Sequence, residues 1–146
     1  MNSDHRFATA APARIRIGCD VHSVANVVQS IEVFGDRYLQ RVFTPRERAE
    51  CTGAAAAERL AGRFAGKEAV LKALRVPADV AIPWPTIEIV ADASGAPIVN
   101  LTGRAAEFAA FRGVDTIEIT LSHDDGVALA FAAATSAAWS LEETAA

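Results

Sequence analysis

Residues 60–74 leave no ordinary polar face when their hydrophobic and polar positions are placed on a helix of about 100° per residue. Leu60, Phe64, Leu71 and Leu74 fall on one stripe. The opposite side carries small residues, namely Ala61, Gly62, Ala65, Gly66, Ala69 and Ala73. The pattern predicts a long helix, from about Ala56 to Leu74, that is packed on most of its sides.

Charged residues interrupt this packed helix. Lys67 lies within the apolar stripe, and Glu68 and Lys72 follow its edge at a spacing of i, i+4. Burying charges is costly unless they are paired or bound to a ligand or metal. The segment therefore reads either as a functional site or as a structural pair between Glu68 and Lys72 along the helix.

The first half of the chain alternates strand and helix signals. Residues Arg14–Asp20 alternate polar and apolar positions, which predicts a half-buried strand. Helical spacing over Val21–Phe34 predicts a helix that Gly35 ends. Thr44, Pro45 and Glu47 form a capping box, which predicts a short helix to about Cys51.

The second half of the chain is dominated by short strands. The pattern predicts strands at Thr86–Val90, Ile98–Leu101, Thr116–His123 and Val127–Ala134, and a helix at Arg104–Phe111. We expect an α+β domain over residues 14–136, with a mainly antiparallel sheet packed against the long helix. Residues 1–13 read as a disordered lead-in and 137–146 as a loosely held tail.

Composition excludes several classes of protein. The chain has 146 residues and a formal charge of −4, which argues against general nucleic-acid binding. No apolar run approaches the ~20 residues that span a bilayer. Cys19 and Cys51 form no metal-binding spacing, so we expect reduced thiols and a cytoplasmic protein. An anionic ligand would need a local cationic cluster, such as Arg63, Lys67, Lys72 and Arg75.

Two carboxylates are candidates for a magnesium site. Asp20 ends the first predicted strand, and Glu68 lies on the packed helix. Magnesium in phosphate chemistry takes one or two protein carboxylates and fills its other positions with water and phosphate oxygens. From spacing alone, the structural pair between Glu68 and Lys72 remains an equal alternative.

Three motifs in order resemble the holo-acyl-carrier-protein synthase family, the small 4′-phosphopantetheinyl transferases. They are IGCD at 17–20, FTPRE at 43–47 and LAGRFAGKEA at 60–69. Further matches are Trp84 with residues 87–89, Gly95 with Pro97, and residues 121–123. The resemblance spans roughly residues 14–134, and several ordered motifs are more specific than any one of them.

The resemblance implies the family's fold and an enzyme that moves the phosphopantetheine arm of coenzyme A onto a serine of an apo acyl carrier protein or carrier domain. Asp20 and Glu68 then match the ligands of Mg²⁺, and Lys72 would meet the departing adenosine 3′,5′-bisphosphate. The base is either Glu68, through a metal-bound water, or Asp124. The implied coenzyme A contacts are Arg63, Lys67, Lys72, Ser122 and His123.

The resemblance also implies a homotrimer with active sites at the subunit boundaries. One departure concerns the first helix, where the family usually carries a glutamate and basic residues that meet the carrier. This chain has Ser23, Ala25 and Asn26 there. Recognition of the carrier would then fall to other residues, for which the candidates are Arg37, Arg41, Arg46 and Arg48. The carrier would be an unusual one, such as a dedicated or fused synthase domain.

Two competing interpretations stand beside the transferase. A non-catalytic subunit that binds coenzyme A or the carrier would keep the scaffold, but binding alone would not need Asp20, Glu68 and Lys72 together. An ordinary α+β domain would leave the ordered motifs unexplained.

Overall fold

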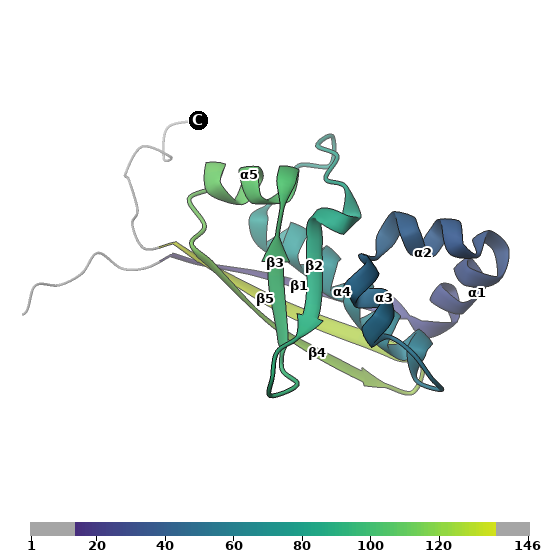
Figure 1. The fold of residues 1–146 in the computed structure, drawn as a ribbon. Coiled ribbons are helices and arrows are strands. Elements are labelled where there is room, and N and C mark those ends of the chain that lie inside the picture. Colours follow the sequence, from purple (N-terminus) through teal and green to yellow (C-terminus); the bar gives the residue numbers. More distant parts are fainter. Residues whose placement is uncertain (1–13, 137–146) are drawn as a thin grey trace, which may run out of the picture.

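The computed structural model describes residues 14–136 (Figure 1). The predicted lead-in and tail lie outside the described residues. In chain order the elements are β1 (Arg14–Ser23), α1 (Val24–Phe34), α2 (Asp36–Val42), α3 (Pro45–Glu50), α4 (Ala56–Leu74), the 3₁₀ turn η1 (Trp84–Thr86), β2 (Ile87–Ala91), β3 (Pro97–Leu101), α5 (Gly103–Phe111), β4 (Thr116–Asp124) and β5 (Val127–Ser136).

The architecture confirms the predicted α+β class. The strands β1, β5 and β4 form one antiparallel sheet in that order, and β2 and β3 form a separate antiparallel hairpin. The long helix α4 lies against the sheet, with α1, α2 and α3 gathered at one end of the molecule (Figure 1). Its bounds, Ala56–Leu74, are those that the sequence predicts, and buried residues occur along most of its length.

The sequence prediction is wrong at two places near the amino terminus. Residues 21–23, which were expected to begin the first helix, continue β1 and pair with residues 127–129 of β5. Here the strand partner outweighs the helical spacing of the local sequence. A second helix, α2, follows Gly35, whose φ of 53° turns the chain between α1 and α2. Its seven residues are too few to display a clear helical period.

The strand β1 crosses α4 at very close range. A Cβ atom on Gly18 would lie 1.9 Å from the Ala69 carbonyl oxygen and 2.5 Å from the Ala73 nitrogen. Only glycine on the strand and alanine on the helix permit this approach. The neighbouring strand β5 contributes further small residues to the same layer, namely Ala128, Ala130, Ala132 and Ala134, all of which are buried.

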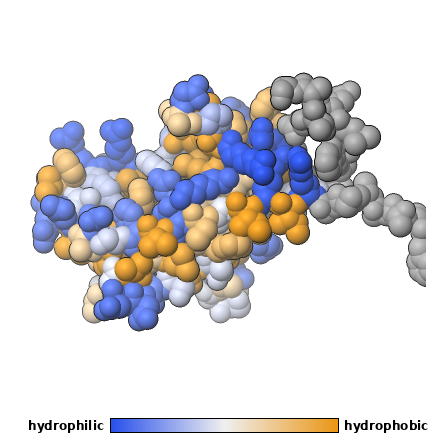
Figure 2. Space-filling view, turned by 180° about the vertical axis from the view of Figure 1, so that it is seen from behind, coloured by the Kyte–Doolittle hydropathy of each residue, from blue (hydrophilic) through white to orange (hydrophobic). Residues whose placement is uncertain are grey.

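The apolar side chains of β1 point away from α4. Ile15 and Ile17 are 62% and 59% exposed, and Phe131 of β5 on the same outer face is 41% exposed. Arg16 and Gly18 instead face the core. The strand is half-buried, as predicted, but its apolar side is the uncovered one. Seen from behind, apolar side chains form an interrupted band across the molecule (Figure 2).

Among residues 14–136, no helix has the length and apolarity needed to cross a bilayer. On β1 and β5, the side chains of Ile15, Ile17 and Phe131 form an exposed apolar face, and such a face is typical of a protein–protein contact surface.

Replacing Gly18 with Ala should destabilise the protein by about 3 kcal/mol, because the new methyl group would overlap the α4 backbone, which cannot rotate away. Urea unfolding followed by circular dichroism measures the change. The matched control is Gly62→Ala on α4, where a Cβ would meet only a Leu121 methyl at 3.9 Å. That control should be neutral or stabilising by up to about 1 kcal/mol. Equal stability of Gly18→Ala and the parent would contradict the close approach.

Candidate active site

Asp20 and Lys72 meet where β1 passes α4. The Lys72 Nζ atom donates to Asp20 Oδ1 at 2.8 Å and to the Cys19 carbonyl oxygen at 3.0 Å. The hydrogen bond to Asp20 is the main cause that raises the pKa of Lys72. The lysine therefore stays cationic at neutral pH, and its ion pair joins two elements that are 52 positions apart in the chain.

Glu68 lies beside this pair, one helical turn before Lys72. Partial burial raises the pKa of Glu68, the negative charge of Asp20 raises it further, and Lys72 opposes both. Two carboxylates that repel each other in a half-buried site favour an added cation. The described residues hold no group of three or more His, Cys, Asp or Glu that would form a complete cage. A two-carboxylate set suits Mg²⁺, which leaves most of its positions to water and phosphate.

A shallow pocket, here called the α4 hollow, adjoins these groups. Its walls include Glu68, Leu71, Lys72, Val76, Ile82 and Trp84. Glu68 and Lys72 of α4 thus bring charged groups to the hollow, and aliphatic side chains line much of the remainder. This arrangement suits a ligand with an anionic head and an uncharged chain.

A row of tilted aromatic rings borders the same region. The ring of Trp84 lies 5.1 Å from that of Phe64, and the Phe64 ring lies 4.5 Å from His22. Burial lowers the pKa of His22, and the charge of Asp20 partly opposes this shift. Sequence reasoning gave His22 no role. Phe64 lies exactly four residues before Glu68, so its place on the same side of α4 could have been read from the helical period.

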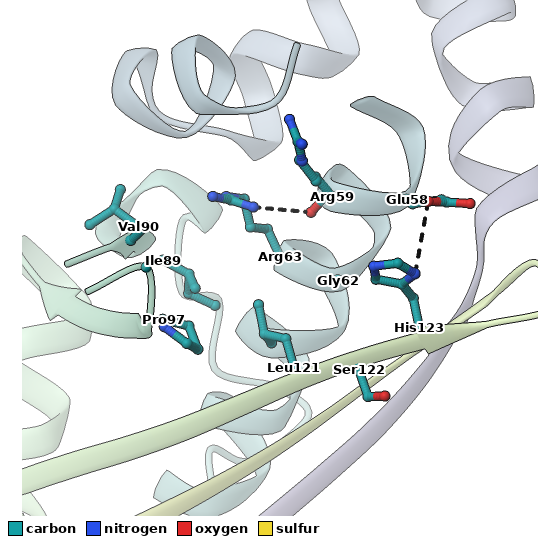
Figure 3. Close-up of a pocket in the computed structure, with 12 residues that line it drawn as sticks. Glu58, Arg59, Gly62, Arg63, Ile89, Val90, Pro97, Leu121, Ser122 and His123 are labelled. Atoms are coloured by element: carbon teal, nitrogen blue, oxygen red, sulfur yellow. Dashed lines mark hydrogen bonds and ion pairs between the residues drawn. The ribbon is translucent and has the colours of Figure 1, made fainter. Parts of the chain in front are cut away.

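A second pocket, here called the β4 pocket, lies at the amino-terminal half of α4 (Figure 3). Its lining includes Arg59, Arg63, Ser122 and His123. The His123 Nδ1 atom lies 3.8 Å from Glu58 Oε2, an interaction marked by a dashed line in Figure 3. Arg63 and His123, two of the residues that the resemblance assigns to coenzyme A, thus line one pocket together with Arg59, which the sequence did not single out. Ser122 borders the pocket from β4, and its side chain points away from it (Figure 3).

Arg63 is already engaged by the protein. Its guanidinium Nη2 atom donates to Glu50 Oε2 at 2.8 Å, and the side chain is largely buried. The same Glu50 oxygen accepts from the Ala91 backbone nitrogen. Much of the charge that Arg63 brings to the β4 pocket is therefore balanced by Glu50.

The prediction that Lys67 contacts coenzyme A is wrong. Lys67 is 0% exposed, and its ammonium group donates to Glu47 Oε2 and to the carbonyl oxygens of Trp84 and Ile87. An ammonium has three donors, so none is left for a ligand. Burial is the dominant influence on the Lys67 pKa and lowers it, and the Glu47 charge opposes the shift.

Asp124 is separated from Asp20 by the sheet. Asp124 and Ser23 both pair with Val127, so these residues share the outer face of the strands. Asp20 stands three residues from Ser23 and therefore on the inner face. By the same alternation, Ser122 points to the outer face, whereas His123 points inward. Within one copy, Asp124 is not brought to Glu68.

The four arginines proposed for the carrier fall into two settings. Arg37 and Arg41 are exposed and line a hollow on α2 together with Phe34 and Tyr38. Arg46 lies 3.6 Å from Glu50, and Arg48 is half-buried. The first two arginines are therefore the more available for an external anion.

The chain is similar to known proteins over most of its length. The model of the 4′-phosphopantetheinyl transferase superfamily matches residues 16–132. The holo-[acyl-carrier-protein] synthase of Desulforudis audaxviator is 44% identical over 119 residues, which cover 81% of this chain and 90% of that protein. Its counterpart from Clavibacter sepedonicus is 42% identical over 115 residues, covering 79% and 90% of the two chains.

A solved structure shares the fold as well. The holo-[acyl-carrier-protein] synthase of Helicobacter pylori, in complex with coenzyme A, superposes with a TM-score of 0.72 at 29% identity. The match covers 81% of this chain and 98% of that one. With the family model matching most of the sequence, and with Asp20 and Glu68 together in the fold, the chain belongs to the 4′-phosphopantetheinyl transferase superfamily.

Proposed function

We propose that this protein transfers the 4′-phosphopantetheine arm of coenzyme A to a serine of an apo acyl carrier protein or carrier domain. The observation that carries the proposal is the meeting of Asp20, Glu68 and Lys72 beside the α4 hollow. The serine oxygen forms a bond to the β-phosphorus, and the diphosphate bond breaks. Adenosine 3′,5′-bisphosphate leaves, and the serine proton passes to a base.

Asp20 and Glu68 would hold Mg²⁺, which supplies charge neutralisation at the diphosphate. Lys72 adds a fixed positive charge at the same place and would stabilise the departing bisphosphate. Glu68 and Asp124 remain the candidates for the base, and of these only Glu68 lies beside Lys72 in one copy.

The β4 pocket would receive the nucleotide end of coenzyme A, with Arg63 and His123 as contacts within one copy. Ser122, whose side chain lies on the outer face of the sheet, would contact coenzyme A only at the site of a neighbouring copy. Because Arg63 is paired with Glu50, it would contribute hydrogen bonds to the ligand but little net positive charge. We place the reaction in the cytoplasm, which agrees with the free thiols of Cys19 and Cys51.

We further propose that three copies associate through the outer face of the sheet. This face exposes Ile15, Ile17 and Phe131, and association would remove them from water. It would also allow a neighbouring copy to supply outer-face residues such as Ser122 and Asp124 to a site at the subunit boundary. The resemblance assigns Ser122 and Asp124 to the active site, whereas within one copy they lie across the sheet from Asp20. Supply by a neighbouring copy would explain both.

For the carrier, we propose a docking surface on α2 around Arg37 and Arg41. Both arginines border the aromatic side chains of Phe34 and Tyr38, so an acidic helix with an apolar side chain would complement the surface. Arg46 and Arg48 would lie at its margin.

Purified protein incubated with coenzyme A, Mg²⁺ and a panel of apo carriers should raise the mass of a carrier by one phosphopantetheine arm. Chelation with EDTA should abolish the gain. Glu68→Gln should lower the rate by about 100-fold or more, because a carboxylate charge is lost with little change in volume. Mass spectrometry of the carrier measures the transfer, and circular dichroism tests whether the fold is intact. No mass gain with any carrier, or full activity of Glu68→Gln, would refute the assignment.

Replacing Ile17 with Asp should break the assembly into single copies, because a charge would be buried in the contact. Light scattering after size-exclusion chromatography measures the mass of the assembly. The matched control is Phe111→Ser on α5, whose side chain is 81% exposed but lies outside the sheet face. A wild-type protein that runs as a monomer would contradict the proposal, as would a trimeric Ile17→Asp variant.

The double variant Arg37→Glu with Arg41→Glu should raise the KM for the carrier by about tenfold or more, since both charges face the docking partner. The KM for coenzyme A should stay within about twofold. Arg104→Glu, an exposed charge reversal on α5, serves as the control for net charge. An unchanged carrier KM in the double variant would place the docking surface elsewhere.

A further inference from the structure

The buried ion pair of Glu47 and Lys67 ties together four elements around the α4 hollow. Lys67 of α4 donates to Glu47 of α3 at 2.8 Å, to the Trp84 carbonyl of η1 at 3.1 Å, and to the Ile87 carbonyl of β2. Glu47 in turn accepts from the backbone nitrogen of Ile89 at 2.8 Å and from that of Thr44 at 2.8 Å. Every one of these bonds beyond the ion pair ends on a backbone atom.

Stability alone does not explain such a pair. Removing two charges from water is costly, and well-packed apolar residues often replace a buried ion pair at no loss. What the charged pair adds over apolar residues is directional hydrogen bonding, because each donor and acceptor binds one particular backbone group. Its effect is to set where η1 and β2 lie relative to α4.

The segment that depends most on this anchor is the wall of the α4 hollow. Between the end of α4 and η1, backbone hydrogen bonds such as those from Val76 to Leu71 and from Val80 to Pro77 join residues that are close in the chain. The segment supplies Val76 and Ile82 to the hollow and ends at Trp84. The hydrogen bond from Lys67 to Trp84 therefore fixes the carboxyl-terminal end of this segment, which contains no helix or strand between α4 and η1.

Trp84 connects the buried ion pair to the candidate active site. Its carbonyl oxygen accepts from Lys67, and its side chain lines the hollow together with Glu68 and Lys72. The indole also contacts the Phe64 ring at a tilted angle, and Phe64 in turn contacts His22 beside Asp20. A shift of the Trp84 backbone would thus move a surface that adjoins the reacting groups.

We propose that Glu47 and Lys67 are positioning residues, which hold the Trp84 wall of the α4 hollow in the orientation that the substrate requires. They touch no substrate themselves. The inference rests on the proposed function for its kinetic readout, although the placement of Trp84 can be measured without it.

The test removes both charges together, because a single substitution would leave an unpaired buried charge. The double variant Glu47→Gln with Lys67→Met keeps the side-chain volumes close and takes away the donor to Trp84. The same pair of substitutions is also made in a Trp84→Leu background. Ile117→Ala, a partly buried core position that lines neither the α4 hollow nor the β4 pocket, controls for loss of stability.

The neutral pair should lower kcat/KM for transfer by about tenfold or more in the parent, because small displacements of a positioned wall are costly to rate. In the Trp84→Leu background the same substitutions should cost about twofold or less, since the wall is already lost. The inference is overturned if the loss is equal in both backgrounds, or no greater than that of Ile117→Ala once unfolding free energies are compared.

A second readout does not depend on activity. With Trp139, the other tryptophan of the chain, replaced by Phe, acrylamide quenching reports on Trp84 alone. The neutral pair should raise the quenching constant of the folded protein, and Ile117→Ala should not. Unchanged quenching would refute the positioning role. If the parent transfers no arm to any carrier, the proposed function fails, and quenching alone decides this inference.

Discussion

At the point where β1 crosses α4, the backbones come so close that not even a methyl group fits on the strand at Gly18. Gly18 provides the space on the strand, and Ala69 and Ala73 provide it on the helix. Asp20 follows Gly18 by two residues and so points to the same side of the strand. Lys72 directly precedes Ala73. The contact that packs the core therefore also sets the distance between the charged groups of the site.

This coupling explains why so much of the site could be predicted from the sequence. The stripe of small residues on α4 indicated close packing, and the charged residues among them indicated a functional site or a structural ion pair. The ordered motifs then joined Asp20 to Glu68, which no spacing argument could do. Local patterns fix the elements, whereas the meeting of residues 48 positions apart depends on a tertiary crossing.

The misassigned features have a common physical origin. The sequence placed Lys67 in a ligand site because an ammonium on an apolar stripe needs a partner, and that reasoning was sound. The partner is Glu47. The sequence had explained Glu47 by its place in the capping box, so it offered no reason to pair this residue with Lys67. Likewise, the alternation over Arg14–Asp20 predicted most of β1, but no such pattern says which face of a sheet packs on its own core. Such choices depend on long-range partners that a single sequence does not display.

The helix α4 takes part in two ion pairs that differ in burial and in role. The pair of Lys67 and Glu47 is fully buried, bonds to backbone groups and cannot exchange its partners for a ligand. The pair of Lys72 and Asp20 is partly exposed, so an incoming cation and diphosphate could replace each partner at modest cost. Because Lys67 and Lys72 lie five residues apart, they point to different sides of α4. One side of the helix is thus fixed by a buried pair, and the other carries the exposed pair to which the proposed function assigns the substrate.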